Sequence, residues 1–115
     1  MGLATHPFHQ HITYMNKSLK RVRAALEASG ATVNIFKTQL ARTAADAASA
    51  VNCDIDQIAK SIILKGEISN QAILFVTAGS NRVDTIKAAT IAGEALGKAD
   101  AALIRSQTGF AIGGV

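Results

Sequence analysis

Aromatic residues are scarce in this sequence. Tryptophan is absent, and the 115 residues include only one tyrosine and four phenylalanines. Proteins that bind single-stranded nucleic acid by stacking use several exposed aromatic side chains, so the composition disfavours this mode of binding. The interior must be built from alanine, isoleucine, leucine and valine.

Cysteine, proline and long apolar runs are equally rare. The single cysteine, Cys53, excludes an internal disulfide framework and indicates a reducing compartment. One proline and a charged fraction of 17% argue against a disordered chain. No apolar run approaches the roughly 18–20 residues that cross a bilayer, and the first residues lack the pattern of a secretory signal. We therefore expect a cytoplasmic protein that does not enter a membrane.

The length and the hydrophobic fraction of 49% predict a single domain. Residues 1–15 show no clear periodicity and are expected to form an N-terminal arm, followed by one domain over residues 16–115. The arm contains His6, His9 and His11. Two of them could share a strand face as metal ligands, but no cysteine or carboxylate lies nearby to complete a site. A flexible polar arm is the default, and no metal is expected.

Positive charge is concentrated in the first third of the chain. Residues 1–42 carry six basic residues and one acidic residue, whereas residues 43–115 carry six basic and seven acidic residues. A basic face in the first third can meet nucleic-acid phosphates, although it can equally be a solvated helix face. The cations that begin the first predicted helix oppose its dipole, which hints at a role other than stability. They are Lys17, Lys20, Arg21 and Arg23.

Hydrophobic periodicity and capping residues predict alternating helices and strands. In chain order, the predicted elements are helix 17–29, strand 31–37, helix 44–51, one turn after Asp54, strands 59–65 and 71–77, helix 83–96, a short strand, helix 101–107 and strand 110–112. This order predicts an α+β fold with a mixed sheet, and the nearly continuous apolar runs predict that both sheet faces are covered. The last strand begins where the sequence stops, so either a partner completes the fold or the full domain is longer.

Lys60 is the first candidate for chemistry. It opens an apolar strand, where a partly desolvated ammonium can bind a phosphate or a carbonyl oxygen. The competing interpretation is a strand-end lysine whose charged tip reaches into solvent. Ser61 alternates to the other face of the strand, although its backbone can still line a site.

The glycine-rich stretch 108–114 is the second candidate, because backbone N–H groups at successive glycines can approach an oxyanion closely. It lacks the spacing of a dinucleotide fingerprint or a P-loop, and taken alone such a stretch is more often a tight turn. Cys53 has no histidine outside the N-terminal arm to act as its base, so no nucleophilic role is expected. Asp54 and Asp56 are better explained as residues that begin a helical turn than as an acid–base pair.

Four segments together resemble the YbaK/ProX family, the domain that is also inserted in bacterial prolyl-tRNA synthetases. They are residues 43–48, 57–63, 80–84 and 108–115. Their order and spacing are fairly specific, and the resemblance runs from about Ala31 to Val115. It implies an α+β domain whose mixed, partly barrel-like sheet is flanked by helices. The family's domain usually continues past Gly113 and Gly114 with further strands, which leaves open that the domain is C-terminally incomplete here.

The resemblance implies trans-editing, the hydrolysis of the ester between a wrong amino acid and the 3′ end of a tRNA, typically Cys or Ala on tRNA(Pro). Lys60 matches the family's essential lysine, and the backbone of Gly113 and Gly114 would hold the substrate. Ser61 matches a position that is often threonine in the cysteine-specific branch, while Thr43 and Phe36 are expected to border the pocket. No cofactor is implied, and water or a substrate group would be the nucleophile.

The implied partners are the aminoacyl end of tRNA, with the four cations of the first helix on its backbone, and prolyl-tRNA synthetase. Two other interpretations stay open. The first is a module of the same fold that binds tRNA or a synthetase without catalysis. The second is a structural protein whose open sheet edge pairs with another chain, such as a second copy in a homodimer.

Overall fold

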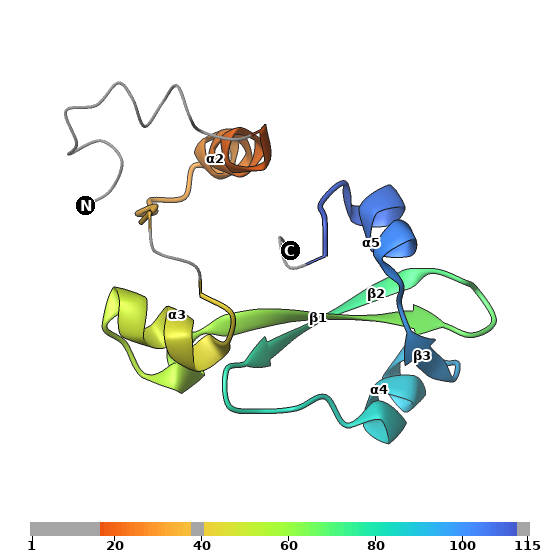
Figure 1. Cartoon of the computed structure of the whole chain (residues 1–115). Helices are drawn as coiled ribbons and strands as arrows, with labels where there is room; N and C mark the ends of the chain where they lie inside the picture. Colours follow the sequence, from red (N-terminus) through yellow and green to blue (C-terminus); the bar gives the residue numbers. More distant parts are fainter. Residues whose placement is uncertain (1–16, 38–40, 113–115) are drawn as a thin grey trace. The chain divides into compact units, whose positions relative to one another are not determined.

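The structure is a computed structural model that describes residues 17–37 and 41–112. Its contacts divide the chain into two units, Met1–Leu40 and Ala41–Val115, and each is described by itself (Figure 1). Among the described residues, no helix is long and apolar enough to span a membrane. The predicted boundary between an arm and a domain at residue 15 stays a prediction.

In the first unit, the predicted helix is confirmed as α2, Lys17–Ser29. It ends where Gly30 adopts a left-handed conformation with φ of 78°, which a residue without a Cβ reaches at little cost. The predicted strand at 31–37 is wrong, because this segment has no ladder to another strand. Alternation of apolar and polar residues favours a strand, but a strand also needs a partner for its backbone groups.

In the second unit, three strands form one antiparallel sheet: β1 (Ala59–Gly66), β2 (Ala72–Ala78) and β3 (Leu96–Lys98). Their order is β2-β1-β3. The predicted α+β class is therefore confirmed. The sheet was predicted to be mixed and partly barrel-like. Among the described residues, every strand pairing is antiparallel and the sheet is open.

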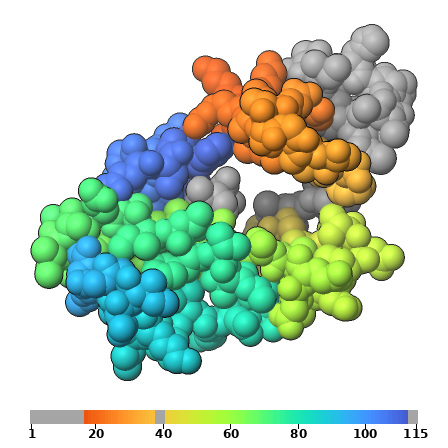
Figure 2. Space-filling model, turned by 180° about the vertical axis from the view of Figure 1, so that it is seen from behind, coloured from red at the N-terminus to blue at the C-terminus, as the bar shows by residue number. Residues whose placement is uncertain are grey.

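The register of the hairpin assigns side chains to the two faces of the sheet. Lys60 pairs with Thr77 and Ile62 with Phe75, so these four residues share one face. Leu74 and Val76 belong to the other face and are 53% and 70% exposed. The expectation that both faces are covered is therefore wrong for β2. Figure 2 shows β2 and the loop after it in green to teal, between α4 and the α3–η2 segment.

The helices of the second unit each begin directly after the residue that caps them. They are α3 (Ala44–Val51), the 3₁₀ turn η2 (Ile55–Gln57), α4 (Thr85–Ala92) and α5 (Ala101–Thr108). Small apolar side chains form most of the interior, which contains Ala48, Ala88, Ala99 and Ile104.

Two boundaries differ from the prediction. The helix expected over 83–96 is shorter, because the Asp84 carboxylate accepts from the N–H groups of Ile86 and Lys87 and Gly93 ends the helix with φ of 81°. Leu96 therefore enters β3. The strand expected at 110–112 is wrong, because the Phe110 N–H donates to Thr108 Oγ1 at 3.0 Å and turns the chain after α5.

The turn of the β1–β2 hairpin is held by Glu94, a residue from another part of the chain. Its Oε1 accepts from the N–H groups of Ile68 at 2.8 Å and Ser69 at 2.9 Å. Hydrogen bonds from the Ser69 backbone and side chain, and then from Ile68, lower the pKa of Glu94 below its ordinary value. The carboxylate thus links the hairpin turn to the segment after α4.

We expect this link to make stability depend on pH. Because the folded pKa of Glu94 is lowered, its contribution is present above the ordinary glutamate pKa and is lost as the pH falls through the lower, folded value. Glu94→Gln should therefore reduce the free energy of unfolding at pH 7 more than at pH 3. Urea denaturation at the two pH values measures this difference. Equal losses at both values would show that the charge of Glu94 does not stabilise the turn.

Candidate functional site

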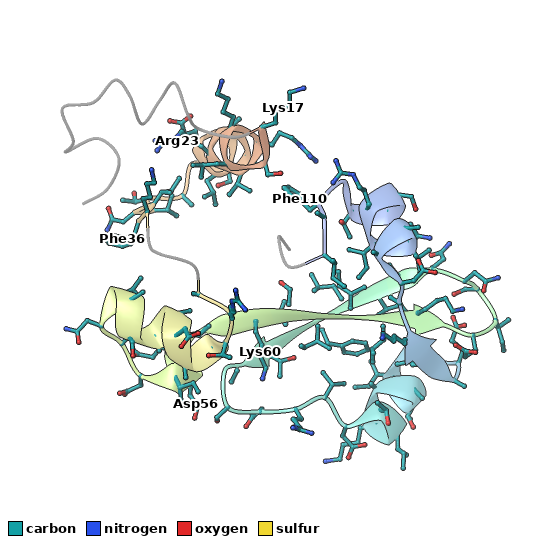
Figure 3. The ribbon with its side chains drawn as sticks, in the orientation of Figure 1. Lys17, Arg23, Phe36, Asp56, Lys60 and Phe110 are labelled. Atoms are coloured by element: carbon teal, nitrogen blue, oxygen red, sulfur yellow. The ribbon has the colours of Figure 1, made fainter. Side chains whose placement is uncertain are left out.

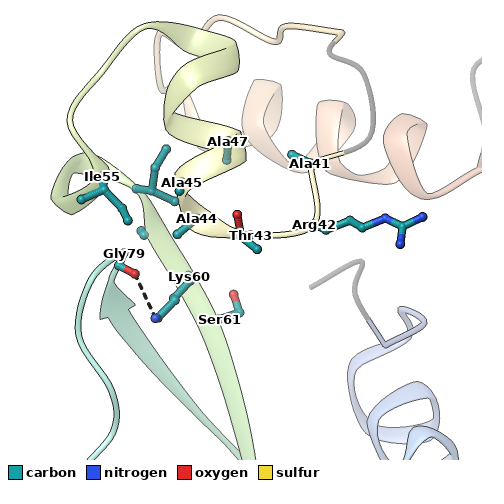
Figure 4. A pocket seen from close by; sticks show the side chains of 12 residues that line it. Ala41, Arg42, Thr43, Ala44, Ala45, Ala47, Ile55, Lys60, Ser61 and Gly79 are labelled. Carbon is teal, nitrogen blue, oxygen red and sulfur yellow. Dashed lines mark hydrogen bonds between the residues drawn. The ribbon is translucent and has the colours of Figure 1, made fainter.

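A pocket of about 580 Å³ lies at the start of β1 in the second unit (Figure 4). Its walls come from the start of α3 and the residues before it, from η2, from the first residues of β1 and from the loop after β2. The lining residues are Ala41, Arg42, Thr43, Ala44, Ala45, Ala47, Ile55, Ile58, Ala59, Lys60, Ser61 and Gly79.

The α3 wall begins at the predicted helix cap, Thr43. Thr43 Oγ1 accepts from the Asp46 N–H at 3.1 Å, and the Asp46 carboxylate accepts from the Arg42 N–H at 3.2 Å. Both bonds hold the first turn of the helix, but the carboxylate bonds the residue before Thr43 and not the N-cap N–H that a capping box uses. The wall behind them is made of alanine side chains. It is therefore apolar and leaves room for a bound group.

The η2 wall packs closely against the loop after β2. The Asp54 N–H donates to Gln57 Oε1 at 2.9 Å, which holds the turn in shape. Gly79 lies so close to this turn that a Cβ at its position would overlap the Ile55 carbonyl oxygen and lie 3.1 Å from the Ala44 Cβ. Glycine at this position therefore lets η2, α3 and the loop meet.

Lys60 is tethered in this pocket. Its Nζ donates to the Gly79 carbonyl oxygen at 3.0 Å, in a partly buried hydrogen bond (Figure 4). The side chain thus crosses from β1 to the loop after β2, instead of extending into solvent. An ammonium has three N–H donors, and this bond occupies one of them. The others can meet the oxygen of a bound ligand.

Asp56 lies at the same end of β1, beside Lys60 (Figure 3). Its Oδ1 accepts from the Ser80 backbone N–H at 3.0 Å and from the Ser80 hydroxyl. These two hydrogen bonds, and to a smaller extent the positive charge of Lys60, lower the pKa of Asp56 below its ordinary value. The carboxylate is therefore ionised at neutral pH and links η2 to the residue after Gly79.

Three of the predicted site residues lie together in this pocket: Lys60, Ser61 and Thr43. Phe36 belongs to the first unit, where its side chain is 53% exposed, and its predicted place at the pocket stays a prediction. Gly113 and Gly114 lie outside the described residues, as do the three histidines. Cys53 is half-buried between α3 and η2.

The four predicted tRNA-backbone residues lie on α2 in the first unit. Lys17, Lys20 and Arg21 are exposed, while Arg23 is half-buried. The helix has no acidic residue in its first turn, so nothing there offsets the cations against the helix dipole. The described part of the chain contains no group of three histidine, cysteine, aspartate or glutamate side chains that could hold a metal ion.

Sequence reasoning missed several residues of the site. Gly79 and Ser80 are separated from η2 by more than 20 positions. No local sequence pattern predicts that a carbonyl of this loop accepts a hydrogen bond from Lys60. Arg42 also lines the pocket, with its side chain directed outward from the rim (Figure 4). Arg42 directly precedes the Thr43 cap, so its position next to the start of α3 could be read from the sequence.

The part of the chain that contains the pocket is similar to known proteins. Residues 38–115 match the family model of the aminoacyl-tRNA editing domain. Among solved structures, a protein provisionally described as a trans-editing enzyme for prolyl-tRNA synthetase is 40% identical, with a TM-score of 0.78 over 88% of this chain. A scaffold protein used for grafting linear epitopes is 38% identical over 88% of this chain, also with a TM-score of 0.78. A hypothetical protein is 26% identical over 83% of the chain, with a TM-score of 0.72.

The likeness covers only part of each of these solved structures. The chain spans about two thirds of the length of these structures, between 63% and 65%. A search of the curated proteins found no match. The family match covers α3, η2, the sheet, α4 and α5, and it includes every residue of the Lys60 pocket. The chain belongs to the aminoacyl-tRNA editing domain family, the YbaK family that the sequence motifs indicated.

Proposed function

We propose that this protein is an aminoacyl-tRNA deacylase that acts in trans on mischarged tRNA, most specifically on Cys-tRNA(Pro) or Ala-tRNA(Pro). The observation that carries the proposal is Lys60 Nζ, held at 3.0 Å from the Gly79 carbonyl in a pocket that also contains Ser61 and Thr43. The ammonium keeps donors for an ester oxygen, and the pocket that holds it also contains two hydroxyl side chains. The family of editing domains supplies the reaction class.

The reaction is the hydrolysis of an ester. Water attacks the carbonyl carbon, the carbonyl oxygen becomes an oxyanion, and the bond from carbon to the ribose oxygen then breaks. The ribose oxygen takes up a proton, and the amino acid leaves as its carboxylate. A fixed cation that stabilises the oxyanion lowers the barrier, and this is the role proposed for Lys60. Gly113 and Gly114 remain proposed as backbone donors to the same substrate.

The walls of the pocket support a small substrate side chain. Ala44, Ala45 and Ala47 offer an apolar surface without a charged group. A synthetase pocket built for proline discriminates against similar or smaller side chains by only about 10–200-fold, so a second site is needed to remove the errors. Cysteine and alanine are such side chains, and the alanine wall can accept either of them.

The proposed partners follow from this substrate. The tRNA would present its 3′ end to the Lys60 pocket, with Lys17, Lys20, Arg21 and Arg23 on its phosphates. Binding through phosphates weakens with added salt, so the affinity for tRNA should fall steeply as the salt concentration rises. Prolyl-tRNA synthetase is the proposed protein partner and the cytoplasm the proposed compartment. A homodimer is also proposed, because β2 leaves one edge of the described sheet unpaired.

The alternative function is a module that binds tRNA or a synthetase without catalysis. Incubation with Cys-tRNA(Pro) and Ala-tRNA(Pro), labelled in the amino acid, separates the two possibilities. We expect free amino acid to appear faster than in buffer, at a rate proportional to the protein concentration. Retention of the tRNA on the protein without release of amino acid would support the binding module instead.

A further inference from the structure

Asp56 is a charged group beside the pocket that the proposed chemistry does not use. It does not line the pocket, and its side chain is exposed. Yet its Oδ1 accepts two hydrogen bonds from Ser80, a residue 24 positions further along the chain. A helix-start residue would use its carboxylate on its own turn. Asp56 instead binds the loop after β2, so we expect its role to concern the position of that loop.

That loop presents the hydrogen-bond acceptor of Lys60. Gly79 precedes Ser80 directly, and its carbonyl oxygen accepts from Lys60 Nζ at 3.0 Å. On its other side, Gly79 is in close contact with the backbone of Ile55, the residue that precedes Asp56. Two adjacent residues of η2 therefore hold two adjacent residues of the loop: Asp56 bonds Ser80, and Ile55 contacts Gly79. Together they fix the position of the Gly79 carbonyl relative to η2.

The loop has few other restraints at this point. Among the described residues, the hydrogen bonds of the loop are the two to Asp56, the one from Lys60 and a turn bond from the Asn81 N–H to the Ala78 carbonyl. The turn bond closes the loop on itself and does not connect it to η2. Without Asp56, the Gly79 carbonyl would depend on packing alone, and Lys60 Nζ would lose a fixed partner.

We infer that Asp56 is a positioning residue that acts through Ser80 and the Gly79 carbonyl to hold the Lys60 ammonium in the pocket. The inference rests on the proposed function for its consequence in catalysis. Its structural part concerns only the order of the Lys60 side chain. Asp56→Asn keeps the shape of the side chain and removes its charge, and Ser80→Ala removes one of the two hydrogen bonds. Ser80→Thr keeps the hydroxyl and should behave like the wild type.

The first test needs no substrate. In protein labelled with ¹³C at the lysine ε-carbons, the signal of Lys60 is assigned from its absence in Lys60→Arg. We expect Asp56→Asn and Ser80→Ala to move this signal toward the position of freely rotating lysines. Asp54→Asn, which removes a carboxylate from the residue that begins the same turn, should leave it in place. An unmoved Lys60 signal in both Asp56→Asn and Ser80→Ala would overturn the inference.

The second test measures coupling through a ligand. The probe is 3′-amino-3′-deoxyadenosine acylated with alanine, in which a stable amide replaces the ester. We expect Asp56→Asn to weaken its binding about five- to tenfold when Lys60 is present and less than about twofold when Lys60 is alanine. Equal weakening in both backgrounds would show that Asp56 does not act through Lys60.

The outcomes of the two tests are independent of each other. If the wild-type protein neither binds the probe nor hydrolyses mischarged tRNA, the proposed function is wrong, while the lysine signal still decides whether Asp56 orders Lys60. If hydrolysis occurs, kcat gives a further readout. Asp56→Asn should lower kcat and raise KM with the melting temperature little changed, and Ser80→Thr should restore the loss seen in Ser80→Ala. A loss of kcat that follows the melting temperature across these variants would indicate a merely structural role and contradict the inference.

Discussion

Lys60→Ala is expected to reduce the rate of amino-acid release from Cys-tRNA(Pro) or Ala-tRNA(Pro) by about 10²–10³-fold, the usual effect of removing one donor to an oxyanion. The physical reason is the tether at Gly79, which holds Nζ in the pocket with donors left for the substrate. The variant should fold, because the side chain is only half-buried and its removal leaves the strand pairing of β1 intact. The rate under single-turnover conditions is the measurement.

Lys65→Ala is the matched control for this prediction. It removes the same side chain and the same charge from the same strand. However, Lys65 lies five residues along β1 on the opposite face, where it pairs with Ala72 and Gly97. Its rate should stay within about twofold of the wild type, since it is outside the pocket. A similar loss in both variants would assign the effect to net charge and tRNA attraction, and Lys60 would lose its role in the chemistry.

Gly79→Ala is expected to have the largest effect on stability, about 2–3 kcal/mol of lost unfolding free energy, as overpacking a well-fitted contact typically costs. A Cβ at this position would overlap the Ile55 carbonyl oxygen and lie 3.0 Å from the carbonyl carbon, and backbone atoms of η2 cannot rotate away. The same displacement would shift the carbonyl that holds Lys60. Activity should therefore fall even at temperatures where the variant is folded.

Gly97→Ala provides the comparison, because a Cβ there would also meet another group closely. In that case the group is the carboxylate end of Glu67, a flexible side chain that can turn into solvent. The expected loss is below about 1 kcal/mol, within the range of an ordinary surface substitution. Thermal denaturation of the two variants measures the difference. If Gly79→Ala were as stable as Gly97→Ala, the close packing of the loop on η2 would be refuted.

The predictable parts of this fold are those governed by neighbours in the sequence. The caps at Thr43 and Asp100 satisfy N–H groups three residues away, so the starts of α3 and α5 follow from local chemistry, whereas the Asp84 cap of α4 was not predicted. The β1–β2 hairpin follows in the same way from two apolar runs joined by a short turn. The errors at 31–37 and 110–112 arose where a strand pattern existed without a partner strand.

The candidate site also has a part that could be predicted from the sequence and a part that could not. Lys60 was identified because it opens an apolar strand, and the resemblance then assigned it a role. Its acceptor at Gly79 and the support from Asp56 and Ser80 join segments 19 and 24 residues apart. Such contacts depend on how η2 packs against the loop after β2, and no spacing rule in one sequence contains that information. The structure was therefore needed to place the acceptor.

Editing requires hydrolysis of the wrong products and survival of the right one. The most direct measurement is the rate of amino-acid release from Cys-tRNA(Pro), Ala-tRNA(Pro) and Pro-tRNA(Pro) under identical conditions. We predict that Cys-tRNA(Pro) or Ala-tRNA(Pro) is hydrolysed at least about tenfold faster than Pro-tRNA(Pro), the lower end of what shape selection achieves. Equal rates for all three, or no release above buffer from any of them, would show that the protein does not edit products of this tRNA.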